Sequence, residues 1–169
     1  MAVADRLCVM KHGRVEQIGT PLELYNIPQN RYVAQQLGSP PINFVSGQFH
    51  PWSGLFEASE MPLAATTAAA NAGHGAAWLG VRPEDLSIAH KPAGAVSVPA
   101  TIYEVEPLGA VTIVDVEVGD QILKAQLPGQ PKFSRGESVH LCFDLAKCHL
   151  FDSASERRLA TGLAAVARN

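Results

Sequence analysis

The chain has 169 residues, which allows one domain or one domain and part of another. Its net charge of -3 and its pI near 6.0 leave no positive field that would attract nucleic acid or an anionic membrane surface. No apolar run reaches the roughly 18 residues that span a bilayer, and the start lacks the order of a secretion signal. We therefore expect a soluble protein without a nucleic acid partner.

A β-hairpin and two short helices are predicted first. The apolar runs Leu7–Met10 and Val15–Ile18 flank Gly13, which can adopt the positive φ of a tight turn. Residues 20–23 (Thr-Pro-Leu-Glu) combine a hydroxyl N-cap, an early proline and a glutamate that can reach back to the cap amide. A second helix is expected from Asn30 to Leu37.

A domain boundary is expected after this second helix, because Gly38 ends it and the prolines at 40 and 41 suit an extended connector. This predicts three parts: residues 1–38, a β domain over residues 39–152 and a tail over residues 153–169.

Short strand-like runs, cut by turn residues at intervals of about ten, are typical of a barrel or a sandwich. The expected strands are Ile42–Phe49, Leu55–Ala58, Ala76–Val81, Val96–Glu106, Val111–Val118, Gln121–Leu127, Val139–Asp144 and Cys148–Phe151. Alternation is clearest where Val114, Val116 and Val118 face one side while Asp115 and Glu117 face the other. The fold class predicted is mainly β.

Two segments give weaker signals. The tract from Ala64 to Ala77 is poor in large apolar groups, and we expect a mobile surface loop there. From Ser153 onward an alanine-rich end predicts a short helix or a frayed tail.

The cysteines Cys8, Cys142 and Cys148 are odd in number and scattered, which fits reduced thiols in the cytoplasm. His140 and His149 lie close to the last two in sequence, a grouping that could in principle bind a metal. The spacing of these four residues matches no recurrent zinc pattern, and we expect no bound metal.

Catalytic motifs are absent from the sequence. It contains no glycine-rich phosphate loop ending in Gly-Lys-Ser/Thr, no Gly-x-Ser-x-Gly elbow and no His-Glu-x-x-His motif. Two pairs of carboxylates lie two positions apart, Asp115 with Glu117 and Glu104 with Glu106. A solvent-exposed outer face of the sheet explains these carboxylates better than acid/base catalysis does. We expect neither enzymatic activity nor a cofactor in this chain.

The order of several motifs resembles one family. From Ala4 to Phe44 the chain is similar to the end of the ATPase domain in the maltose and glycerol-3-phosphate family of ABC importers. The motifs that carry this resemblance are Ala4-Asp5-Arg6-Leu7, Gly13-Arg14-Val15, Gln17-Ile18-Gly19-Thr20-Pro21, Glu23-Leu24-Tyr25, Tyr32-Val33-Ala34, Leu37-Gly38-Ser39-Pro40 and Asn43-Phe44. Further on, residues 79–86 (Leu-Gly-Val-Arg-Pro-Glu-Asp-Leu), 104–109 and 148–151 resemble that family's Gly-(Ile/Val)-Arg-Pro-Glu, Val-Glu-x-Leu-Gly and His-Leu-Phe motifs.

The resemblance implies a C-terminal, non-catalytic part of an ATP-binding subunit. In the family the segment like Ala2 to Arg6 directly follows the switch histidine. The sequence at hand opens at Met1, so the ATP- and Mg²⁺-binding residues are expected upstream, in the full-length parent. A fragment and a truncated gene would look the same, and it stays open whether residues 1–38 keep their pairing or swap between chains.

What the family suggests is an OB-like, transport-associated fold of one or two barrels that pairs with a second copy and regulates ATP-driven uptake of a solute such as a sugar. The implied partners are the membrane-spanning subunits and a regulatory protein, and the implied location is the inner face of the cell membrane. Residues proposed for interface or regulatory contacts are Arg82, Pro83, Glu84, Gly109, His149 and Phe151. Arg82 and Glu84 could pair locally or across an interface, while Pro83 fixes the strand exit.

A small-ligand module is the alternative, because related barrels hold an oxyanion such as molybdate or sulfate between subunits. Those barrels often begin with Ser-Ala-Arg-Asn, whereas residues 97–100 here read Ser-Val-Pro-Ala. The missing arginine and asparagine remove the donors that would hold an anion.

Overall fold

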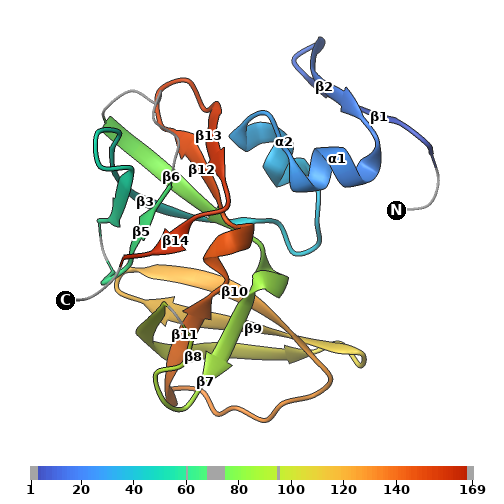
Figure 1. The fold of residues 1–169 in the computed structure, drawn as a ribbon. Coiled ribbons are helices and arrows are strands. Elements are labelled where there is room, and N and C mark those ends of the chain that lie inside the picture. The colour runs from blue at the N-terminus through green and yellow to red at the C-terminus, as the bar shows by residue number, and fades with distance from the viewer. Residues whose placement is uncertain (1–3, 60, 68–74, 95, 167–169) are drawn as a thin grey trace.

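The computed structural model describes residues 4–59, 61–67, 75–94 and 96–166. Within them the chain is mainly β, which confirms the predicted class: two curled antiparallel sheets follow a hairpin and two short helices (Figure 1). Every helix in the described ranges is too short and too polar to cross a bilayer.

The predicted hairpin and helices are present at the start. Strands β1 (Leu7–Lys11) and β2 (Arg14–Gly19) form a two-stranded sheet whose turn includes Gly13 at φ 78°. Helix α1 (Pro21–Asn26) begins with the expected capping box, because the Thr20 hydroxyl accepts from the amide of Glu23 and the Glu23 carboxylate accepts from the amide of Thr20.

Helix α2 (Arg31–Gln36) has Asn30 as its N-cap, and the side-chain oxygen of Asn30 accepts from the amide of Val33 at 2.9 Å. Val33 and Ala34 are fully buried, so this helix anchors the N-terminal segment.

The upper sheet in Figure 1 has seven strands in the order β13-β12-β6-β3-β4-β5-β14. Their bounds are β3 (Asn43–His50), β4 (Leu55–Ala58), β5 (Ala64–Thr66), β6 (Gly75–Val81), β12 (His149–Asp152), β13 (Arg158–Thr161) and β14 (Ala164–Ala165).

The two outermost strands of this sheet are neighbours in sequence. Thr161 ends β13 and Ala164 begins β14, so two residues, Gly162 and Leu163, and at most about 11 Å of chain separate the two sheet edges. The sheet is therefore rolled, and residues 158–165 border both of its edges. We call these residues the strap.

The lower sheet has five strands in the order β10-β9-β8-β11-β7. Their bounds are β7 (Leu86–Ala89), β8 (Ser97–Pro107), β9 (Val111–Val118), β10 (Gln121–Pro128) and β11 (Ser138–Phe143). The alternation expected in β9 is confirmed: Val114, Val116 and Val118 are buried, while Glu117 is exposed and Asp115 pairs with Lys124 at 2.7 Å.

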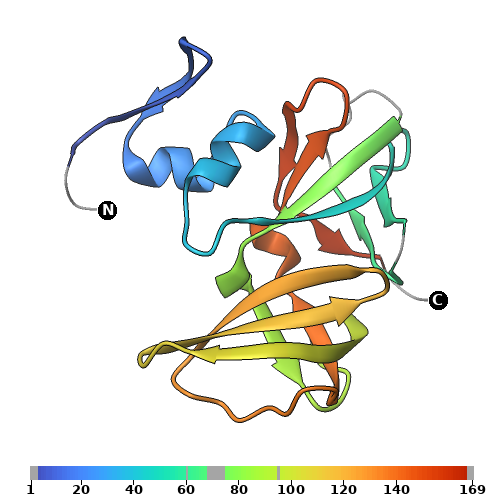
Figure 2. The ribbon, with the colours of Figure 1, turned by 180° about the vertical axis from the view of Figure 1, so that it is seen from behind.

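One apolar core runs through both sheets, with members such as Leu79 of the upper sheet and Leu141 of the lower one. Asn43 also joins them directly. Its amide oxygen accepts from the backbone N–H of Lys124 at 2.8 Å, and its amide nitrogen donates to the backbone carbonyl of the same residue at 2.9 Å. Figure 2 shows β3 passing from the helices into the upper sheet.

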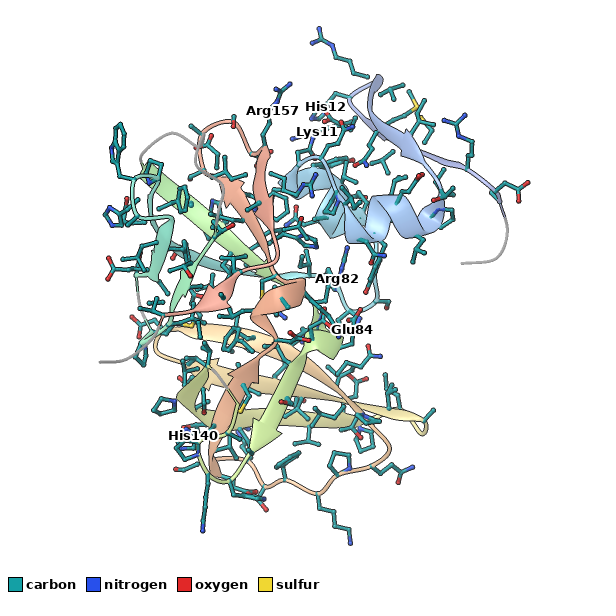
Figure 3. The ribbon with its side chains drawn as sticks, viewed as in Figure 1. Lys11, His12, Arg82, Glu84, His140 and Arg157 are labelled. Atoms are coloured by element: carbon teal, nitrogen blue, oxygen red, sulfur yellow. The ribbon has the colours of Figure 1, made fainter. Side chains whose placement is uncertain are left out.

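The N-terminal segment also contacts the upper sheet of the same chain. Lys11 lies 3.3 Å from Glu156, and Asn30 forms an isolated antiparallel bridge with Arg157. Figure 3 shows Lys11 and His12 of the hairpin beside Arg157. The hairpin thus folds back onto its own chain.

Two predictions were wrong. The alanine-rich tract is not a loop throughout, because Ala64–Thr66 form β5 with Ala65 fully buried, and β6 already begins at Gly75. Residues 68–74 of that tract lie outside the described part. The tail forms no helix at residues 158–165, because the strap extends the upper sheet there and backbone pairing with existing edges outweighs the helix preference of alanine.

Candidate functional site

Arg82 is a buried charged residue at the point where the helices meet the two sheets (Figure 3). Its side chain is only 2% exposed. The guanidinium donates to the carbonyl of Tyr25 at 2.8 Å, to that of Ala34 at 3.2 Å and to that of Leu37. These carbonyls belong to the C-terminal ends of α1 and α2, where unsatisfied acceptors and the helix dipoles favour a cation. We call this contact the arginine clamp.

The Arg82 guanidinium keeps its positive charge although it is buried. Loss of solvation lowers the pKa of Arg82 to about 10, opposed by the nearby negative charge of Asp85. The guanidinium therefore stays protonated at neutral pH. It also lies 3.7 Å from the centroid of the Tyr25 ring, in cation–π geometry. One side chain thereby holds both helices against the barrel.

Glu84 and Asp85 surround the clamp without pairing with it directly. The Glu84 carboxylate accepts from the hydroxyl of Tyr25, and burial raises the pKa of Glu84. Asp85 is paired with Lys147 at 2.9 Å. The sequence suggested a local ion pair between Arg82 and Glu84. In the structure Arg82 instead donates to backbone carbonyls.

Pro83 begins a single 3-10 turn, Pro83–Asp85, directly after β6. Arg82 is extended at φ -72° and ψ 145°, as a residue before proline should be. This turn sends the chain from the upper sheet into β7 of the lower sheet. The Arg-Pro-Glu motif therefore connects the two sheets, and the Arg82 side chain within it extends toward the helices.

The other proposed residues lie in two places. His149 and Phe151 are on β12 and buried, so within one chain they support the barrel rather than offer a surface. Phe151 packs edge-on against Phe44 with centroids 5.8 Å apart. Gly109 lies in the exposed turn between β8 and β9 at φ 86°, away from the clamp.

His149 is neutral in the folded chain. Burial lowers its pKa to about 4, with the positive charges of Arg82 and Arg158 adding to the effect. Its Nδ1 lies 3.0 Å from the Thr161 hydroxyl. This histidine therefore binds a proton more readily in the unfolded chain.

That pKa predicts a loss of stability in acid. The pKa of His149 is lower in the folded chain than in the unfolded chain. Its contribution to the free energy of unfolding is therefore complete above pH 6.5 and falls as the pH drops toward 4. We expect a loss of about 2 kcal/mol between pH 7 and pH 4.5, measured by urea unfolding. His149→Gln should remove this share of the pH dependence. An unchanged pH profile in the variant would contradict the assignment.

Sequence reasoning did not identify Tyr25, which contacts the clamp, or Arg31, which contacts two aromatic rings. Tyr25 supplies a ring, a carbonyl and a hydroxyl, and Arg31 lies 4.4 Å from the Trp78 ring centroid and 4.7 Å from that of Phe44. The available signal was their place within the family-like segment, where Tyr25 lies inside the first short helix and Arg31 opens the second.

The four residues considered as metal ligands do not gather into one site in the described part of the chain. The Cys148 thiol donates to the carbonyl of Asp144, and burial raises its pKa to about 12. His140 and Cys142 lie on β11 of the lower sheet, whereas His149 contacts Thr161. No three His, Cys, Asp or Glu side chains gather as a metal site within the described ranges.

Comparison with known proteins assigns the lower sheet and its surroundings to a family. The TOBE domain family matches residues 79–151, from within β6 to within β12. This range includes the Arg-Pro-Glu motif and all five strands of the lower sheet.

Longer relatives match nearly the whole chain. The alpha-glucoside transport ATP-binding protein AglK of Rhizobium meliloti is 38% identical over 161 residues, which cover 90% of this chain and 43% of that protein. The sulfoquinovosyl glycerol transport ATP-binding protein SmoE of Agrobacterium fabrum is 32% identical, covering 94% and 45%. The sn-glycerol-3-phosphate import ATP-binding protein UgpC of Salmonella typhi is 35% identical, covering 94% and 44%.

The chain thus spans less than half the length of these relatives, and its match includes the TOBE domain rather than a nucleotide-binding motif. The chain therefore corresponds to the C-terminal, TOBE-domain-containing part of the ATP-binding subunits of ABC importers.

Proposed function

We propose that this chain is the non-catalytic accessory domain of the ATP-binding subunit of an ABC importer, and that it regulates solute uptake by pairing with a second copy of itself. The solute is proposed to be a sugar or sugar derivative, as the names of the relatives suggest. ATP and Mg²⁺ are then bound by the parent subunit through residues outside this sequence, which has no phosphate loop.

The observation that supports this role most is the arginine clamp. A domain that braces moving subunits needs a stiff connection to the segment that moves. Arg82 provides one, because its planar guanidinium satisfies three helix-end carbonyls at once. The N-terminal segment and the barrels should consequently move as one unit.

The proposed partners follow from the same role. The membrane-spanning subunits would be reached through the ATPase domain of the parent, which places the chain at the cytoplasmic face of the membrane. A regulatory protein is proposed to bind the barrels. In solution the chain alone is expected to elute as a dimer, and a monomer by light scattering at micromolar to millimolar concentration would contradict self-pairing.

The transport role is tested by a hybrid subunit. In AglK the region that matches this chain is replaced by residues 4–166, and uptake of an alpha-glucoside is measured in cells that lack native AglK. Uptake should be restored by the hybrid and not by AglK cut before that region. The same hybrid with Leu163→Asp, which disrupts the strap, serves as the matched control.

The oxyanion alternative has less support. Ser97 at the start of β8 has a buried hydroxyl without a partner, yet the pocket that it lines contains Glu57 and, among the described residues, no Lys, Arg or His. Titration with sulfate or molybdate by calorimetry should give no saturable heat. A stoichiometric heat would favour the ligand-binding module.

A further inference from the structure

The strap is held against the rest of the upper sheet by a small set of contacts. Its two strands are short, with four residues in β13 and two in β14. Between these strands the amides of Gly162 and Leu163 donate to the carbonyls of Cys148 at 2.9 Å and Leu145 at 2.8 Å. Of the strap residues, all of which the structure describes, only Leu163 is buried. A segment held in this way can open locally while the rest of the domain stays folded.

A buried histidine contributes a side-chain attachment for β13. His149 on β12 is 3% exposed, and its Nδ1 lies 3.0 Å from the hydroxyl oxygen of Thr161 on β13. The same oxygen accepts from Arg158 Nη1 at 2.6 Å. A neutral imidazole fits this arrangement in either tautomer, because the hydroxyl can donate to Nδ1 or accept a second hydrogen bond from it. The uncharged form of His149 therefore helps to hold β13 in place.

The surroundings of His149 disfavour a positive charge on it. Burial opposes protonation most, and the positive charges of Arg82, from the crossover between the sheets, and Arg158, from β13, add to this effect. Phe151, whose ring centroid lies 6.1 Å away, and Asn26 on α1 are uncharged neighbours. A proton on His149 would therefore place a further cation beside two arginines.

The carboxylates near His149 are already bound to other groups. Glu84 accepts from the hydroxyl of Tyr25, and Asp85 pairs with Lys147 at 2.9 Å. These four residues line the same pocket as His149. Burial raises the pKa of Glu84, so acid also removes that negative charge. Either carboxylate would have to give up a partner in order to neutralise an imidazolium.

Opening of the strap relieves this conflict. The pocket of about 270 Å³ between α1 and the upper sheet is lined by both His149 and Thr161. When β13 moves away with Thr161 and Arg158, the imidazole gains contact with solvent through this pocket and loses one of its two positive neighbours. The open form then binds a proton more readily than the closed form, and by linkage a proton favours the open form.

We propose that the strap is an acid-sensitive closure of the upper sheet. When His149 takes up a proton, β13 and β14 leave the edges of β12 and β5, while both sheets otherwise stay folded. The freed edges then present unpaired N–H and C=O groups, which readily pair with a strand of another chain. Acid thus converts a closed sheet into one that associates with other chains.

The test is amide hydrogen exchange of the whole 169-residue chain at pH 7 and pH 4.5, with each rate corrected for the intrinsic effect of pH. We expect the open fraction at Gly162 and Leu163 to rise at least about tenfold at the lower pH. The upper limit is about 60-fold, for an imidazole whose pKa rises from about 4 in the closed form to 6.5 in the open form.

Low concentrations of urea separate local opening from unfolding of the whole domain. Exchange at Gly162 and Leu163 should not depend on urea, because a local opening exposes little surface. Exchange at Val116, in the middle of β9, should accelerate with urea. If the two strap amides showed the same urea dependence as Val116, the strap would open only with the whole domain, and the proposal would be wrong.

Two variants identify the group that senses acid. His149→Gln keeps a polar side chain beside Thr161 but takes up no proton, so the pH effect on strap exchange should fall below about twofold. Glu84→Gln is the matched control, because it removes the other titrating group of the pocket and should retain the effect. Protection of Val116 at pH 7 checks that both variants fold. A pH effect that persists in His149→Gln, or that both variants lose, would overturn the proposal.

Light scattering follows the consequence for the sheet edges. At pH 4.5 the unmodified chain and Glu84→Gln should associate beyond their state at pH 7, and return to pH 7 should reverse this. His149→Gln should not associate further at pH 4.5. Equal association of all three chains, or of none, would contradict release of the edges by His149.

Discussion

Replacing Arg82 with alanine is expected to lower the free energy of unfolding by about 3 kcal/mol. The change leaves the carbonyls of Tyr25, Ala34 and Leu37 without their donor at a buried site, and it removes the stack on the Tyr25 ring. Urea unfolding followed by circular dichroism measures the effect, provided that the slope with urea concentration stays constant.

Arg82→Lys separates charge from geometry. Lysine keeps the positive charge near the helix ends, but its single ammonium group cannot reach three carbonyls from different helices in the way that a planar fork does. We expect this variant to recover less than half of the loss. If Arg82→Ala changed the stability by less than about 0.5 kcal/mol, a value usual for surface substitutions, the clamp would not be a structural element.

The strap is the second site where a single change should have a large effect. Leu163 is 6% exposed between β13 and β14, and its amide donates to the carbonyl of Leu145 at 2.8 Å. Leu163→Asp places a carboxylate in the core and should cost at least about 3 kcal/mol. Since the strap borders both edges of the upper sheet, its loss also leaves β5 and β12 open to pairing with other chains.

Light scattering as a function of concentration should therefore show association of the Leu163→Asp variant beyond any native dimer. Val166→Asp is the control, because Val166 lies just past β14 and is 38% exposed. The control should stay within about 0.5 kcal/mol of the unmodified chain. Similar behaviour of the two variants would show that the strap does not hold the sheet closed.

The sequence predicted the elements whose signals are local. The capping box at Thr20 and Glu23 and the alternation of Val114, Val116 and Val118 each depend on neighbours within a few residues. These signals specified the hairpin, both helices and most of the long strands to within one or two residues.

The elements that were not predicted, β5, β7 and the strap, depend on distant partners. Strand β5 and the strap are rich in alanine, which has little intrinsic strand preference, so only the free edges of β4 and β12 make them strands. The partners of Arg82 lie 45 to 57 residues away along the chain. No spacing rule connects an arginine before a proline with helix ends so distant, and the motif alone suggested a pairing with Glu84 instead.

The proposed function requires that this domain couples and braces subunits without contributing nucleotide chemistry. The ratio of alpha-glucoside uptake to ATP hydrolysis in the AglK hybrid, reconstituted with its membrane subunits in vesicles, tests it most directly. We expect a ratio within about twofold of native AglK, because the chemistry stays in the ATPase domain and the barrels preserve the geometry of the pair. Hydrolysis at the native rate with no uptake, from a hybrid shown to be folded and assembled, would contradict the claim.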